Sequence, residues 1–177
     1  MENNKTSENK KQPFSDLFDW VSSLIVALVA VVVVFTLFFR IVSVDGHSMD
    51  DTLSDGERLV LVTTFYHIDR GDVVVIYRKG EEPLIKRVVA LAGDTVDVND
   101  ETGKVILNGK EIDEPFVKGG ITVRRDLPEN YTVPEGCVFA MGDNRSDSLD
   151  SRILGPFTTD QILGVVAWRL WPLKRLI

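Results

Sequence analysis

The segment from Met141 to Arg152, MGDNRSDSLDSR, carries glycine, hydroxyl, amide, carboxylate and guanidinium groups with almost no apolar spacing. Folding alone seldom requires so many polar groups directly after a predicted strand. Two upstream segments, at residues 46–49 (GHSM) and 86–87 (KR), carry further reactive groups. Together the three segments favour nucleophilic catalysis by a serine hydroxyl, with a lysine as its base.

Lys86 is the stronger candidate for the base because it lies in the apolar run LIKRVVAL at residues 84–91. Burial disfavours the ammonium form and lowers a lysine pKa. Lowering that pKa from about 10.4 to about 8 costs roughly 3 kcal/mol, which a folded domain tolerates. A lysine that extends from a strand edge to solvent is the alternative for this segment taken alone.

Other catalytic groups fit the sequence less well. His47 adjoins Ser48, and neighbours in an extended chain point to opposite faces, while His67 lies in a loop without distinctive neighbours. The two histidines and the single cysteine lack metal-ligand spacing, so we expect no metal and no cofactor. The acidic pairs at residues 50–51 and 81–82 are typical of solvated turns.

The charge balance bears on the choice of partner. The 177 residues have a formal net charge of −7, and residues 40–177 carry 17 basic and 23 acidic side chains. Because binding to a phosphate backbone needs a basic face, this composition argues against nucleic acid as a partner.

The elements that position these residues begin with an apolar run from Trp20 to Phe39, which has no charged residue. At about 1.5 Å per residue it spans roughly 30 Å, the thickness of the bilayer's hydrocarbon core. No small-x-small cleavage site follows, as it would in a secretory signal peptide, and no polar stripe marks a buried core helix. We expect a disordered tail at 1–15, a transmembrane anchor at 16–40 and a catalytic domain at 41–177.

Basic residues near the span indicate its orientation. Three lysines precede it, whereas Arg40 and Arg58 are the basic residues of the next 20 positions. Positive residues favour the cytoplasmic side. By this slim margin we expect a single-pass protein of the cell membrane with a cytoplasmic N-terminus and an extracytoplasmic domain.

Beyond the anchor, short β-rich runs alternate with turn signals. The Asn108-Gly109 pair between two such runs is a strong signal for a two-residue hairpin. Many short strands with close turns predict a mostly β domain, an antiparallel barrel or sandwich. A helical turn is expected at 158–163, and strands are expected at 58–63, 72–77, 84–91, 95–98, 104–107, 110–112, 137–141 and 164–170.

Four segments, in order, resemble the boxes of the bacterial type I signal peptidases, membrane-bound serine proteases that remove signal peptides from exported proteins. The nucleophile box resembles SMDDTL at 48–53, the Arg-Gly-Asp strand RGDVVV at 70–75, the lysine box KRVVALAGD at 86–94 and the last box GDNRSDSLDSR at 142–152. The short domain is similar to the compact Gram-positive form. Asp51 stands where the family usually has proline, which frees φ in the turn after the nucleophile.

By this resemblance Ser48 is the nucleophile and Lys86 its general base. Ser148 would orient the lysine amine, and the Ser48 amide would donate to the oxyanion. Some members add a hydroxyl two residues before the serine; here Gly46 has none, which leaves a second donor undecided. Two ion pairs would brace the site, Arg87 with Asp143 and Asp150 with Arg152.

The resemblance also implies the partners. A secretory preprotein would add as an extended strand between the chain leading into Ser48 and the strand leading into Lys86, and would be cut after a small-x-small motif. The enzyme would also meet membrane lipid and act as a monomer. The positions that match the family's shallow apolar pockets are Val44, Met49, Leu53, Leu84 and Ile85.

Two rival functions stay open at this point. A self-cleaving Ser/Lys protease of the SOS-repressor group would need a DNA-binding segment where this chain has an apolar span. An inactive membrane-anchored β-module that binds partners is disfavoured by the joint presence of Ser48, Lys86 and Ser148.

Overall fold

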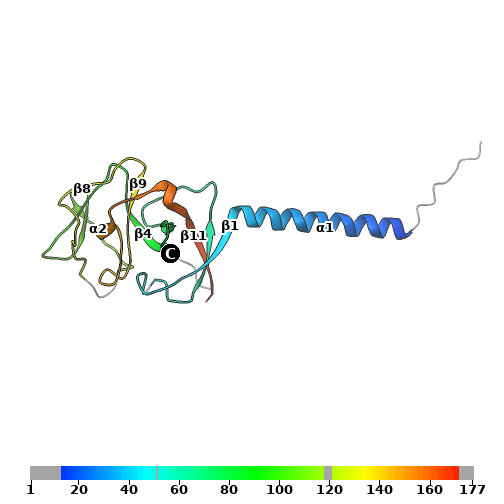
Figure 1. Ribbon diagram of the computed structural model, residues 1–177, viewed down its shortest axis with the longest axis horizontal. Helices are drawn as coiled ribbons and strands as arrows, with labels where there is room; N and C mark the ends of the chain where they lie inside the picture. The colour runs from blue at the N-terminus through cyan, green and yellow to red at the C-terminus, as the bar shows by residue number, and fades with distance from the viewer. Residues whose placement is uncertain (1–12, 51, 118–120, 172–177) are drawn as a thin grey trace, which may run out of the picture. The chain divides into compact units, whose positions relative to one another are not determined.

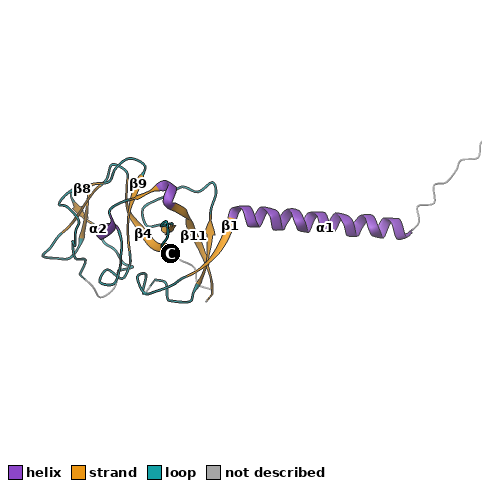
Figure 2. Ribbon diagram, viewed as in Figure 1, coloured by secondary structure: helices purple, strands orange, loops and turns teal. Residues whose placement is uncertain are grey.

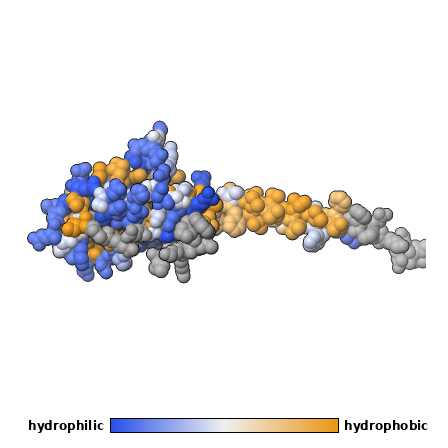
Figure 3. All heavy atoms as spheres, turned by 90° about the horizontal axis from the view of Figure 1, so that it is seen from below, coloured by the Kyte–Doolittle hydropathy of each residue, from blue (hydrophilic) through white to orange (hydrophobic). Residues whose placement is uncertain are grey.

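The computed structural model describes residues 13–50, 52–117 and 121–171, which divide into two compact units at the Phe38–Phe39 boundary. The first unit holds α1 (Pro13–Phe38). Within the described residues, Asp16–Phe38 is the one helical stretch long and apolar enough to cross a membrane. Its side chains are almost all exposed, and Figure 3 shows apolar residues along its length.

The second unit is mostly β (Figures 1 and 2), and every strand pairing in its described part is antiparallel. The predicted fold class is confirmed. The larger sheet has the order β1 (Phe39–Ser43), β2 (Arg58–Val62), β11 (Ile162–Trp171), β3 (Val73–Ile76), β4 (Leu84–Leu91), β9 (Cys137–Met141) and β10 (Phe157–Thr158). The smaller sheet has the order β7 (Lys110–Glu111), β6 (Val105–Leu107), β5 (Thr95–Val98) and β8 (Tyr131–Thr132).

Three apolar clusters hold these sheets in place. One joins valines of the smaller sheet to Phe139 and Met141 of β9, and a second lies among β3, β4, β9 and β11. The third lies under the β1–β2 connection and includes Met49, Leu53, Leu59 and Leu61. This third cluster supports the serine that the sequence singles out.

Several elements differ from the prediction. The helix ends at Phe38 and β1 starts at Phe39, inside the anchor range expected from sequence, because the apolar run continues unbroken through the change from helix to strand. The short β8, β10 and α2 (Ser151–Leu154) were not predicted, since two to four residues are too few to show a period. The expected helical turn is the 3-10 helix η1 (Thr159–Gln161).

The predicted hairpin is confirmed. Asn108 and Gly109 join β6 to β7 with φ values of 52° and 76°, the positive values that a type I′ turn requires at both central positions.

Candidate active site

Ser48 lies in the connection between β1 and β2, where the chain makes a tight turn. The Leu53 N–H donates to the Met49 carbonyl at 2.8 Å, so these two side chains share one face of the turn, and both are buried in the cluster beneath it. Gly46 has a φ of 89°, a conformation that other residues rarely adopt. These features fix the backbone of Ser48 and leave its side chain half-buried.

Lys86 lies on β4 and is 1% exposed. Its Nζ donates to Ser48 Oγ at 2.6 Å and to the Ile85 carbonyl at 3.0 Å. Burial lowers the pKa of Lys86 to about 8, although the charges of Asp150 and Asp143 raise it. A fraction of the lysine is therefore neutral near neutral pH, and the neutral amine is the form that can accept a proton from a serine.

The turn that follows β9 holds the serine from its backbone side. The Asn144 N–H donates to the Ser48 carbonyl at 3.1 Å, and Asn144 Nδ2 donates to the His47 carbonyl at 3.1 Å. Gly142 lies so close that an added Cβ would overlap the Ser48 carbonyl oxygen and the Ser148 side chain. A residue with a side chain at 142 would therefore displace the nucleophile or its neighbour.

Arg87, the residue after Lys86, points to the opposite face of β4. Its Nε and Nη2 donate to the two oxygens of Asp143 at 2.9 and 2.6 Å, and its Nη1 donates to the Gly71 carbonyl at 2.7 Å. The Phe116 ring covers the guanidinium, with its centroid 4.1 Å from Cζ. This buried pair joins β4 to the turn after β9.

The second ion pair, between Asp150 and Arg152, is fully buried. Arg152 Nε and Nη2 donate to Asp150 at 2.9 and 2.8 Å, and the Gly142 N–H donates to the same carboxylate at 3.1 Å. Burial raises the pKa of Asp150, but the hydrogen bonds and charge of Arg152 outweigh it and leave that pKa below its usual value. Both predicted ion pairs are present, and their function as a brace stays a prediction.

Of the two groups assigned to the oxyanion or to orienting the lysine, Ser148 lies differently from expectation, and the role of Gly46 stays undecided. The Ser148 hydroxyl is buried, but within the described residues the hydrogen bonds of Lys86 Nζ go to other groups. The lysine amine is already held by Ser48 Oγ and the Ile85 carbonyl. The Gly46 N–H donates to Asp55 Oδ1 at 3.0 Å and is therefore engaged within the loop.

The predicted pocket residues separate into two groups. Leu84 and Ile85 line an open groove of about 390 Å³ beside the catalytic pair, whereas Val44, Met49 and Leu53 are buried in the cluster below it. Val42, Ile85 and Leu163 pack on that cluster and also line the groove. The full lining is Val42, Ser43, Asp45, Val75, Glu82, Pro83, Leu84, Ile85 and Leu163.

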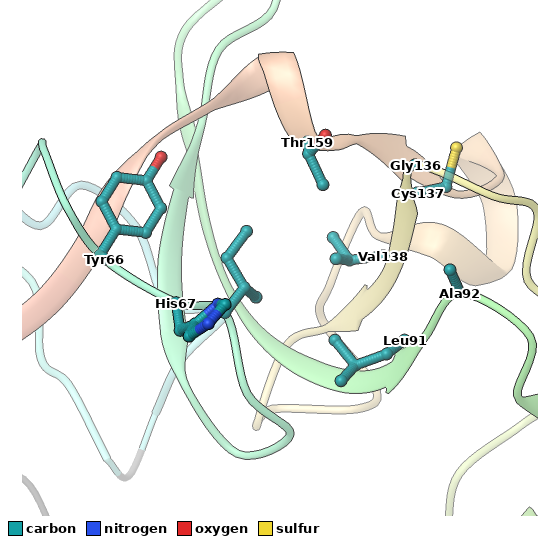
Figure 4. Close-up of a pocket in the computed structure, with 9 residues that line it drawn as sticks. Tyr66, His67, Leu91, Ala92, Gly136, Cys137, Val138 and Thr159 are labelled. Atoms are coloured by element: carbon teal, nitrogen blue, oxygen red, sulfur yellow. The ribbon is translucent and has the colours of Figure 1, made fainter.

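A hollow of about 440 Å³ lies where β4 ends and β9 begins (Figure 4). The labelled His67, Cys137 and Thr159 come from three different segments around it. None of the predicted catalytic residues lines this hollow. Across the described ranges, no three His, Cys, Asp or Glu side chains gather as metal ligands do.

Comparison with known proteins places this chain in a family. A family model described as signal peptidase, peptidase S26, matches residues 17–171. The chain belongs to this signal peptidase family. It is thus a serine peptidase that removes signal peptides from preproteins, and its N-terminal apolar helix fits a membrane-anchored enzyme.

Individual signal peptidases are similar over most of the chain. Signal peptidase IB of Staphylococcus aureus (strain N315) is 33% identical over 175 residues, 89% of this chain and 91% of that protein. Signal peptidase I of Bacillus licheniformis is 36% identical over 185 residues, 96% of this chain and 95% of that protein. A crystal structure of a signal peptidase I from Enterococcus faecalis V583 has a TM-score of 0.50 at 25% identity and covers 58% of this chain and 98% of that chain.

Sequence reasoning did not assign a function to Asn144, Arg145 or Glu114. The first two lie in the polar box at 142–152, whose density of hydrogen-bonding groups was the available signal. Glu114 lies in no such box, and its contact with Arg145 spans 31 positions of the chain. Asp51 lies outside the described residues, so the effect of replacing the usual proline there stays a prediction.

Proposed function

We propose that this signal peptidase cleaves by a Ser48–Lys86 dyad. The observation that carries the proposal is the 2.6 Å hydrogen bond between a buried lysine amine and Ser48 Oγ. The lowered pKa of Lys86, about 8, supports a base that works near neutral pH.

The steps follow from the positions of these groups. Neutral Lys86 takes the proton of Ser48 Oγ as that oxygen attacks the scissile carbonyl carbon, and the Ser48 N–H donates to the oxyanion that forms. The lysine ammonium then gives its proton to the leaving amine, which leaves an acyl-enzyme. A water molecule activated by Lys86 hydrolyses the ester and restores Ser48.

The preprotein would bind as an added strand. Within the described residues, β1 is the end strand of the larger sheet and pairs with β2, and residues 84–86 of β4 lie beyond the part of that strand that pairs with β9. The groove beside them has an apolar floor. This arrangement supports a main-chain ladder with small side chains packed on the floor, as a small-x-small motif requires.

The proposals on membrane topology, lipid contact and oligomeric state rest on the sequence and on exposed side chains. We infer a cytoplasmic tail at 1–15, an anchor at 16–40 and an extracytoplasmic catalytic domain at 41–177 from the charges that flank the span. Lipid contact is supported by exposed Ile41 and Trp168. A monomer is supported by the site, because all the proposed groups come from one chain.

Cleavage of a model preprotein by the detergent-solubilised protein tests the dyad, with the cut located by mass spectrometry. Ser48→Ala and Lys86→Ala should each abolish cleavage after the small-x-small site, while exposed Lys79→Ala, a matched lysine control, should not. Wild-type turnover by Lys86→Ala would show that another group is the base. No cleavage by the wild type would favour the inactive-module alternative.

A further inference from the structure

A buried ion pair joins Arg145, in the turn that follows β9, to Glu114, which lies outside the four predicted boxes. Arg145 Nη2 donates to Glu114 Oε1 at 2.6 Å and Nη1 donates to Oε2 at 2.8 Å, a bidentate arrangement. The side chains are 1% and 8% exposed. Glu114 lies in the long connection after β7, far from the catalytic boxes in sequence.

Arg145 also donates hydrogen bonds to two groups other than Glu114. Its Nη1 also donates to Thr122 Oγ1 at 2.8 Å, and its Nε donates to the Gly142 carbonyl at 3.0 Å. The guanidinium is rigid and planar, so fixing one edge of it fixes the direction of the other donors. The position of the Gly142 carbonyl is thereby tied to Glu114 and Thr122.

Gly142 transmits this constraint to the reacting groups. Its N–H is held by Asp150 Oδ2 and its carbonyl by Arg145, so the peptide groups on both sides of its Cα are fixed. There is no space for a Cβ between Gly142 and the Ser48 carbonyl. A shift of Gly142 would therefore be transferred directly to the Ser48 backbone.

We propose that Glu114 is a positioning residue for the signal peptidase reaction: through Arg145 it fixes Gly142 and thereby the Ser48 backbone against Lys86. Thr122 is the second support of the same guanidinium. The proposal rests on the Ser48–Lys86 dyad. Neither residue belongs to the four boxes or touches the catalytic pair, and both act by holding Arg145.

A set of full-length variants in detergent tests the proposal by kcat, KM and thermal unfolding. Glu114→Gln keeps the shape but not the charge of the contact, Glu114→Asp keeps the charge and shortens its reach, and Thr122→Val removes only the hydroxyl acceptor. Asp97→Asn is the control, because Asp97 of β5 forms a partly buried ion pair with Arg124 and is not among the proposed catalytic or positioning residues.

We expect Glu114→Gln to lower kcat at least about tenfold per folded molecule with KM nearly unchanged, since misplaced reacting groups slow the chemical step. Glu114→Asp should retain more activity, and Thr122→Val should have a smaller effect. Asp97→Asn should leave kcat within about twofold of the wild-type value, even if it lowers the melting temperature as much as Glu114→Gln does. The pH at half-maximal rate should not move, because the base is untouched.

Two outcomes would overturn the assignment. If Glu114→Gln lowers the melting temperature but keeps wild-type kcat per folded molecule, the ion pair is structural only. If Asp97→Asn lowers kcat as much as Glu114→Gln does, the effect is not specific to this contact. Cleavage by Ser48→Ala would instead refute the dyad itself, so the two proposals fail by different results.

Discussion

At the scale of single residues, the depressed pKa of Lys86 predicts the pH dependence of the reaction. With a pKa of about 8, the neutral amine should increase, and with it the rate of the chemical step, by roughly tenfold from pH 7 to pH 9. Single-turnover cleavage of a preprotein measures this step. A rate that stays constant from pH 6 to pH 10 with chemistry limiting would contradict the assignment of Lys86.

The same lysine links stability to pH with a definite sign. Between pH 8 and about 10.4 the unfolded chain holds the Lys86 proton more tightly than the folded chain, so folding stability rises with pH in this window. Below pH 8 the full cost of charging the buried amine is present. Comparing the free energy of unfolding of wild type with that of Lys86→Met, which lacks this titration, isolates the contribution.

The absence of a side chain at Gly142 gives a second residue-scale prediction. Gly142→Ala should lower kcat by about a hundredfold or more, because the new Cβ meets the Ser48 carbonyl and shifts the reacting groups. KM should change much less, since the groove lies on other residues. Gly136→Ala is the control, because no atom lies within 4 Å of the added Cβ; its φ of 69° makes alanine strained there, so stability should fall while kcat per folded molecule is kept. Equal activity of the two variants would show that the site adapts to the methyl group.

At the scale of elements, the groove between β1 and β4 carries charge as well as an apolar floor. Exposed Asp45 and Glu82 both line it. A preprotein with an acidic residue in the segment that enters the groove should therefore be cleaved about two- to fivefold more slowly than one with a neutral residue.

The combined change Asp45→Asn and Glu82→Gln should remove most of that discrimination, and added salt should weaken it in the wild type. The measurement is kcat/KM for a matched pair of preproteins. Unchanged discrimination in the double variant would mean that the acidic residue binds elsewhere.

Sequence reasoning reached the elements with clear local signals. The strand carrying Lys86 was found because eight apolar-rich residues lie between turns, and the 108–109 hairpin because its two residues tolerate positive φ. The change from helix to strand at Phe39 was missed because both sides of it are apolar. Long-range contacts such as Glu114 with Arg145 leave no local pattern in one sequence.

In the candidate site, too, residues with a local sequence signal were predicted and features that depend on long-range packing were not. The boxes identified Ser48, Lys86 and the partners of both ion pairs, which the structure brings together. They did not predict that Ser148 would lack a bond to the lysine, since hydroxyl geometry depends on the packing around Gly142. Burial of Val44 and Met49 likewise depends on the cluster beneath the loop.

At the scale of the whole molecule, the apolar helix should raise the local concentration of substrate. Enzyme and signal peptide that share one membrane or micelle meet at an effective concentration set by that phase. Adding detergent micelles at fixed bulk concentrations should therefore slow cleavage of a full preprotein. Cleavage of a short soluble peptide with the same site should not slow, and identical responses of the two substrates would show that the helix contributes nothing to encounter.

Neighbouring positions on β4 have separate tasks, because Lys86 faces the serine while Arg87 faces Asp143 on the other side of the strand. A protein in which these two residues were exchanged would have the same composition, the same net charge and the same hydropathy. Its guanidinium, which does not lose a proton near neutral pH, would face Ser48, and its amine would face a carboxylate that needs two donors. The chemistry of this enzyme thus depends on which face of one strand each residue occupies. Composition, net charge and hydropathy do not record that property.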